Sequence, residues 1–214
     1  MSFLSVINSR HRALEYLLEF NNVNQDHLFI NPNDLNVDPS ATGVGWFLEI
    51  EISTNVATGA SFSILGRNIG GTSRTFLIVL NDDLLWRFRN DVQNLSVVNF
   101  RNIYSGQDRL KLRLEYEATD GVIYINNVEV ARSPHGNLFP TGDVSNPFYI
   151  GRATSSDSTS PYYFYNYNIN GDKWNLNEGS GFDVFSDGSN ILATGVTSNA
   201  GGLTYWNNNV WQKV

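Results

Sequence analysis

Cysteine is absent from the 214 residues of this chain, and lysine occurs only three times. Without thiols the chain can form no disulfide bond, no thiolate zinc site, no iron–sulfur cluster and no cysteine nucleophile. Secreted animal modules of this size often carry a disulfide bond, so the absence of cysteine favours a bacterial or phage source.

Basic residues are also outnumbered by acidic ones, and the formal net charge is −7. Affinity for nucleic acid comes chiefly from neutralising phosphates, so we expect no nucleic-acid partner. No apolar run approaches transmembrane length, and residues 1–10 lack the pattern of a signal peptide. We therefore expect no membrane insertion, and release from the cytoplasm by another route such as lysis.

Charged residues make up only 16% of the chain, so its polar surface consists mostly of Asn, Ser, Thr and Gly. Asparagine alone accounts for 28 residues. Asparagine tolerates the left-handed backbone of tight turns, which fits many short connections between strands. Its amide group also pairs with sugar hydroxyls, although the turn explanation is the simpler one.

The clearest structural pattern lies over residues 109–131. Leu110, Leu112, Leu114 and Tyr116 alternate with charged residues, the period of two expected for a half-buried strand. Asp120-Gly121 and then Asn126-Asn127 can turn the chain back on itself. Further short strands are predicted over 13–20, 46–53, 62–65, 75–80, 84–89, 95–104, 148–152 and 162–168, with 66–73 as a glycine-rich turn. This spacing predicts an all-β sandwich or barrel of antiparallel sheets.

The length suits one domain with a sizeable core. We predict a single β-sandwich domain over 1–214, in which 1–12 form an N-terminal arm. Residues 171–214 are expected to form a C-terminal extension that completes the sandwich.

Two segments resemble a known family. The order of the 109–131 hairpins followed by Phe148-Tyr-Ile-Gly-Arg152 resembles the concanavalin A-like lectin/glucanase superfamily, particularly its laminin-G-like jelly rolls. The likeness is clearest over 109–152 and extends over 43–170. The segment 174–181 is similar to a recurrent segment of those modules, and its late position is similar to that in phage tail and virion proteins of this fold. The resemblance implies a two-sheet antiparallel jelly-roll sandwich that recognises surface glycans.

Laminarinase-type glucanases belong to the same superfamily and carry the motif Glu-x-Asp-x-x-Glu. The nearest match here is Glu49-Ile-Glu51-Ile-Ser-Thr54. Carboxylates at i and i+2 share a strand face and could form a retaining pair. However, Thr54 replaces the third acid and Glu51 replaces the aspartate, so we predict that the chain is not an enzyme.

Metal-binding patterns are weak. The stretch from Asn166 to Asp172 has the alternation and glycine of a calcium loop, but asparagines stand where carboxylates should be, and Glu178 falls one position late. His11, His27 and His135 lie too far apart for ligand spacing. We expect no cofactor, with Ca²⁺ as the alternative.

Two groups of residues are candidates for sugar binding. Arg87 and Arg89 share a face opposite Trp86, and would project beside Glu49 and Glu51 if their strands are neighbours. Tyr163, Tyr165 and Tyr167 share one face of a strand in strict alternation. Sugars stack on aromatic rings and pair their hydroxyls with planar polar groups. The predicted glycan-binding residues are Arg87, Arg89, Tyr163, Tyr165, Glu49 and Glu51.

The sequence thus predicts a non-catalytic recognition module on a phage tail or virion surface. Its expected partners are a glycan or host surface receptor, other virion proteins and further copies of itself in a homo-oligomer. The expected location is the virion, or otherwise the extracellular space. One alternative is a purely structural virion protein, and another is a polysaccharide-cleaving enzyme.

Overall fold

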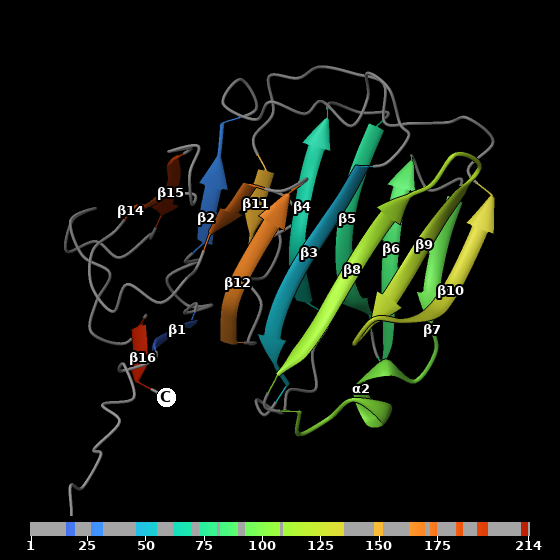
Figure 1. Ribbon diagram of the computed structural model, residues 1–214, viewed down its shortest axis with the longest axis horizontal. Coiled ribbons are helices and arrows are strands. Elements are labelled where there is room, and N and C mark those ends of the chain that lie inside the picture. The colour runs from blue at the N-terminus through green and yellow to red at the C-terminus, as the bar shows by residue number, and fades with distance from the viewer. Residues whose placement is uncertain are drawn as a thin grey trace, which may run out of the picture.

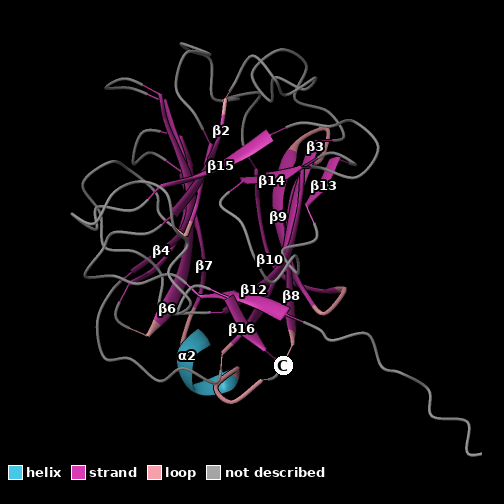
Figure 2. Cartoon of the chain, turned by 90° about the vertical axis from the view of Figure 1, so that its left-hand side faces the viewer, coloured by secondary structure: helices cyan, strands magenta, loops and turns pink. Residues whose placement is uncertain are grey.

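Two antiparallel β-sheets face each other in the computed structural model of this chain (Figures 1 and 2). The structure describes residues 16–19, 27–31, 46–54, 62–69, 73–80, 82–89, 93–107, 109–134, 148–151, 163–169, 172–174, 183–185, 192–196 and 211–213. No helix in these ranges has the length and apolar character needed to cross a membrane.

The first sheet has the strand order β10-β9-β8-β3-β12-β1-β16, and β13 also pairs with β12. Its strands are β1 Tyr16–Glu19, β3 Trp46–Ser53, β8 Leu110–Tyr116, β9 Asp120–Ile125, β10 Val128–Pro134, β12 Tyr163–Ile169, β13 Asp172–Trp174 and β16 Trp211–Lys213. The second sheet has the order β14-β15-β2-β11-β4-β5-β6-β7. Its strands are β2 His27–Ile30, β4 Phe62–Ile69, β5 Ser73–Leu80, β6 Asp83–Arg89, β7 Gln93–Val97, β11 Phe148–Ile150, β14 Asp183–Phe185 and β15 Leu192–Val196.

Alternation along β8 gives the sheet one dry face and one wet face. Leu110, Leu112, Leu114 and Tyr116 are fully buried, and the residues between them are half-buried. The paired strand β3 repeats the pattern, with Leu48, Ile50 and Ile52 fully buried. The predicted half-buried strands are therefore confirmed for the centre of this sheet.

The core between the sheets includes a pair of large aromatic side chains. Trp86 of β6 and Tyr116 of β8 are both fully buried. Their rings meet edge to face, with centroids 5.1 Å apart. Such a pair adds about 0.5–1.5 kcal/mol beyond the burial of its area. It therefore joins the two sheets directly, while β7 also contacts β9 and β10 across the sandwich.

The turn between β9 and β10 follows the prediction. Asn126 and Asn127 have φ angles of 50° and 65°, the left-handed conformation that asparagine tolerates. The backbone N–H of Asn126 donates to the Lys111 carbonyl at 2.9 Å. The Lys111 N–H donates to the Asn126 side-chain oxygen at 3.0 Å. These two bonds fix the turn beside the start of β8.

The prediction of one strand over 95–104 was wrong. Strand β7 ends at Val97, and a short helix, α2, covers Phe100–Ile103. Asn99 between them has a left-handed φ of 60°, which no strand can continue. Its backbone N–H donates to an Asp83 side-chain oxygen at 2.7 Å, which fixes the change of direction.

The predicted turn over 66–73 was too long. Strand β4 continues to Ile69, and β5 begins at Ser73. Gly66 pairs with Phe76, and the polar residues after it continue the ladder. Glycine therefore marks a position within the strand here, because the backbone hydrogen bonds of the hairpin outweigh its weak strand preference.

Strands from the last part of the sequence join both sheets. β16 pairs with β1, and β15 pairs with β2. The division into an arm over 1–12, one domain and an extension over 171–214 stays a prediction, and the arm lies outside the described residues.

Candidate functional site

The outer face of the first sheet carries rows of charged side chains on β3 and β8. The register places Glu49 opposite Arg113 and Glu51 opposite Lys111. Because the residues between them point into the core, these four side chains share the outward face. Acidic residues of one strand thus lie beside basic residues of its neighbour, an arrangement that stabilises a sheet pair.

This face is hollowed between β3, β8 and β9. The depression is open and has a volume of about 250 Å³. We call it the polar hollow. Its lining residues are Glu49, Lys111, Arg113, Glu115, Tyr124 and Asn127.

Arg113 is held firmly in the polar hollow. Its Nε donates to Glu115 Oε2 at 2.9 Å, and its Nη1 donates to Glu49 Oε2 at 3.3 Å. The guanidinium carbon lies 3.9 Å from the centre of the Phe47 ring, a cation–π contact. Burial acts to lower the pKa of Arg113, but the bonds to Glu115 and Glu49 outweigh it and raise that pKa. The group is therefore a planar cation of fixed orientation.

The two glutamates of β3 have separate partners. Glu49 also accepts from Lys111 Nζ at 2.8 Å. Glu51 accepts from Arg109 Nη1 at 3.1 Å and from the side-chain amide of Asn166. Each carboxylate is thus held by groups that lie on the neighbouring strands or directly before them.

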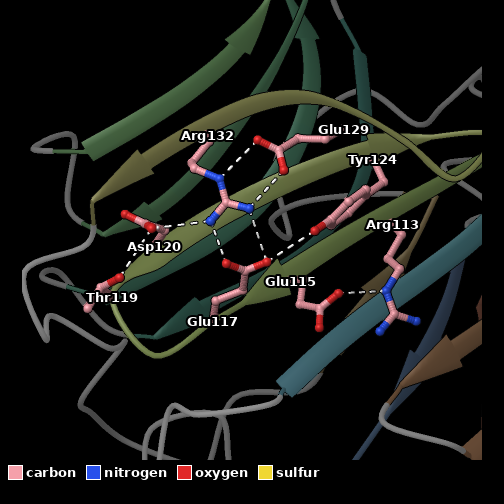
Figure 3. A network of polar contacts seen from close by, with 8 residues as sticks. All are labelled: Arg113, Glu115, Glu117, Thr119, Asp120, Tyr124, Glu129 and Arg132. Carbon is pink, nitrogen blue, oxygen red and sulfur yellow. Dashed lines mark hydrogen bonds and ion pairs between the residues drawn. The ribbon is translucent and has the colours of Figure 1, made fainter.

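A second polar network adjoins the hollow through Tyr124 (Figure 3). Arg132 of β10 donates to Glu117, to Asp120 at 3.2 Å and to Glu129 at 2.8 Å. Hydrogen bonding from Arg132 lowers the pKa of Glu117. The Tyr124 hydroxyl donates to Glu117 at 3.1 Å, and burial together with this carboxylate raises the pKa of Tyr124. Glu117 therefore fixes the hydroxyl of a tyrosine whose side chain lines the polar hollow.

Thr54, at the position of the third acid in the glucanase motif, has a structural role. Its side chain is buried. The hydroxyl donates to the Tyr104 carbonyl and accepts from the Gln107 N–H at 2.9 Å. Its own N–H donates to the Gln107 carbonyl at 2.9 Å, and its carbonyl accepts from Gly106 at 3.3 Å. Thr54 thus ties the 104–107 loop to the end of β3.

The predicted sugar-binding residues fall in different places. Glu49 lines the polar hollow, and Glu51 lies beside it on β3. Arg87 and Arg89 lie on β6, in the opposite sheet, and their side chains are outside the described residues. The condition under which they would project beside the two glutamates is not met, because β3 lies between β8 and β12 and β6 lies between β5 and β7. Their role in sugar binding stays a prediction.

Tyr163 and Tyr165 lie on β12, beside β3. The register shifts between Phe164 and Asn166, so a bulge interrupts the strict alternation on which their shared face with Tyr167 was predicted. Tyr167 itself is buried. The side chains of Tyr163 and Tyr165 lie outside the described residues, so their role stays a prediction.

Five of the six residues that line the hollow were not singled out from the sequence. Lys111, Arg113 and Glu115 were recognised only as the wet side of a strand, and Tyr124 and Asn127 only as parts of a hairpin. The signal that the sequence offered for this site was a pair of basic residues, Lys111 and Arg113, on one predicted strand and a pair of acidic residues, Glu49 and Glu51, on another. Nothing in the sequence says that these two strands are neighbours.

The calcium alternative gains no support from the fold. Asn166 and Asn168 lie within β12, and Asp172 begins β13, the strand that pairs with it. Both ends of the 166–172 stretch are therefore extended β-strand. Within the described ranges, no group of three or more His, Cys, Asp or Glu side chains is placed to hold a metal ion.

Comparison with protein-family models and with curated protein sequences finds no match. Solved structures with similar folds do exist. A candidate carbohydrate-binding protein from Bacteroides ovatus matches with a TM-score of 0.60 and 15% identity, over 87% of this chain and 61% of its own. A heptameric SAP-like pentraxin from Limulus polyphemus matches with a TM-score of 0.50 and 11% identity, over 72% and 75% of the two chains. Domains LG4-5 of the mouse laminin alpha1 chain match with a TM-score of 0.49 and 14% identity, over 77% and 44%.

The likenesses to the Bacteroides protein and to the pentraxin define a class of fold. The chain is an all-β, two-sheet antiparallel jelly roll of the concanavalin A-like type, which confirms the predicted fold class. It spans 44% of the laminin chain and 61% of the Bacteroides chain. At such low identity the likeness establishes fold and leaves function to the residues of the site.

Proposed function

We propose that this chain is a non-catalytic recognition module that binds carbohydrate in the polar hollow. The observation that carries the proposal is the fixed guanidinium of Arg113, which lies between two carboxylates in an open depression. A volume of about 250 Å³ lies just below the roughly 300–1,000 Å³ of drug-sized sites. The hollow would therefore take a single sugar ring at the end or side of a larger glycan.

The lining groups suit a sugar chemically. A hydroxyl group both donates and accepts, so it pairs well with a carboxylate on one side and a cation on the other. The hollow offers carboxylates from Glu49 and Glu115 and donors from Lys111 and Arg113. The ring of Tyr124 adds apolar surface against which the C–H face of a sugar can pack.

The proposal that the chain has no hydrolytic activity rests on the same geometry. A retaining glycosidase needs one carboxylate free to attack and another free to transfer a proton. Glu49 and Glu51 are instead held by separate basic and amide partners, and Thr54 is committed to the loop at the end of β3. A reducing-sugar assay on neutral and acidic glucans tests this, and release of reducing ends would refute it.

Binding is tested by glycan array followed by calorimetry on the best ligand. Arg113→Met removes the central donors but keeps an apolar stem, and we expect it to weaken binding at least tenfold, the effect of losing about 1.4 kcal/mol. Arg109→Met is the matched control, because Arg109 lies on the same face but outside the hollow. Absence of saturable binding by the wild type, or equal loss in both variants, would refute the proposal.

We further propose that the module acts on the surface of a phage tail or virion, as one subunit of a homo-oligomer. The absence of cysteine and the late position of the 174–181 segment support this context. Mass spectrometry and immunogold labelling of purified particles test it, and light scattering tests the oligomer. A chain found in particles that binds no glycan would favour the purely structural role instead.

A further inference from the structure

Every basic side chain that the structure describes on the face of β3, β8 and β10 already lies against a carboxylate. The pairs are Arg109 with Glu51, Lys111 with Glu49, Arg113 with Glu49 and Glu115, and Arg132 with Glu117, Asp120 and Glu129. The carboxylates in these pairs outnumber the cations. The face thus carries excess negative charge, and so does the whole chain, at −7.

From this arrangement we infer that the polar hollow selects neutral saccharides and rejects anionic ones such as sialylated, sulfated or uronic acid-containing glycans. The inference rests on the proposed function and names the ligand class of the same site. Glu115 is the residue that determines this selectivity.

An anionic sugar meets a direct competitor in the hollow. Its carboxylate or sulfate would need Arg113, whose Nε already binds Glu115 at 2.9 Å and whose Nη1 already binds Glu49 at 3.3 Å. Displacing Glu115 would leave two like charges close together in a half-buried site. Like charges that lie close together lower the binding affinity strongly, and proteins use such repulsion to reject the wrong ligand.

A neutral sugar can bind without breaking these pairs. No hydrogen bond from the described residues reaches Arg113 Nη2, and Lys111 Nζ uses one of its three donors on Glu49. Within the described part of the chain, the ion pairs of Glu49 and Glu115 all involve Oε2, so Oε1 of each can accept from a sugar hydroxyl. Hydroxyl groups can therefore bridge cation and carboxylate and add to the existing network.

The test compares neutral oligosaccharides with the same oligosaccharides carrying a terminal sialic acid, sulfate or uronic acid. We expect the wild type to bind a neutral ligand at least tenfold more tightly than its anionic counterpart at about 0.15 M salt. We also expect the affinity for the neutral ligand to change less than about twofold when the salt concentration rises to about 1 M.

The variant Glu115→Gln removes one charge while keeping the shape of the side chain. We expect it to reduce the ratio of the affinities for the neutral and the anionic ligand several-fold. Glu129→Gln is the control, because it removes the same charge from the same face but lies outside the hollow. Thermal melts of both variants establish that they are folded.

Three outcomes separate the possibilities. A wild type that binds the anionic ligand as tightly as the neutral one would overturn this inference and leave the proposed function standing. If Glu115→Gln and Glu129→Gln reduce the ratio of the two affinities equally, the role of Glu115 is overturned. Failure to bind any glycan of either kind would overturn both the inference and the proposed function.

Discussion

Replacing Thr54 with valine should loosen the connection between the end of β3 and the 104–107 loop. Valine has nearly the same shape but no hydroxyl, so the variant loses the bond to the Tyr104 carbonyl and the bond from the Gln107 N–H. A typical hydrogen bond contributes about 0.5–1.5 kcal/mol net, so we expect the free energy of unfolding to fall by about 1–3 kcal/mol. The two backbone hydrogen bonds of Thr54 remain in the variant, so the 104–107 loop should be held less tightly but stay attached to the end of β3.

Two measurements check this prediction. Urea denaturation followed by tryptophan fluorescence gives the free energy of unfolding, and each kcal/mol lost should lower the melting temperature by roughly 2–4 °C. Hydrogen exchange gives the local effect, since the Gln107 amide should lose protection more than amides in the centre of β8. Thr54→Ser is the control, because it keeps the hydroxyl and should keep Gln107 protected.

Either of two results would contradict a structural role for the Thr54 hydroxyl. One is a valine variant within about 0.5 kcal/mol of the wild type, which is the range of surface substitutions without structural consequence. The other is a serine variant that loses Gln107 protection as fully as the valine variant does. That second result would mean that the hydroxyl alone does not hold the loop and that the methyl group is needed as well.

Three further predictions concern the hairpin, the core and a turn. The hydrogen bond from Arg132 lowers the pKa of Glu117 below its ordinary 4.5. The stability that this pair gives the fold is therefore fully present above pH 4.5 and is lost as the pH falls through the lowered folded-state pKa. In thermal melts from pH 7 to pH 3, Arg132→Gln should lose less stability than the wild type. Trp86→Ala removes a fully buried ring and should cost about 3–5 kcal/mol in urea denaturation. Asn99 has a φ of 60°, so Asn99→Val should destabilise by about 1–2 kcal/mol and Asn99→Gly by clearly less, as compared by thermal melts.

Local alternation was enough to predict an all-β sandwich or barrel, whereas the jelly-roll topology was predicted from the resemblance to concanavalin A-like modules. Leu110, Leu112 and Leu114 are separated by charged residues, and burial of every second side chain follows from strand geometry alone. The Asn126-Asn127 turn was equally local, because it depends on the conformations open to asparagine.

The site could not be predicted in the same way, because it depends on which strands become neighbours. Arg113 meets Glu49 across 64 positions of sequence, and no local pattern announces that pairing. The same limit applies to Arg87 and Glu49, which the sequence could group only on the condition that their strands are neighbours, and these strands belong to different sheets. The bulge in β12 is a second limit, because one extra residue reverses every later alternation without changing the composition.

The order of strands has a consequence for the rate at which this chain folds. β3 lies between β8 and β12, β2 lies between β11 and β15, and the bond from Asn166 to Glu51 closes a span of 115 positions. Closing such long loops costs entropy before any contact compensates, and all-β domains with distant pairings fold in roughly milliseconds to seconds. During that time unpaired strand edges are exposed to other chains. Slow refolding from urea, and recovery that improves on dilution or cooling, are therefore expected properties of this topology.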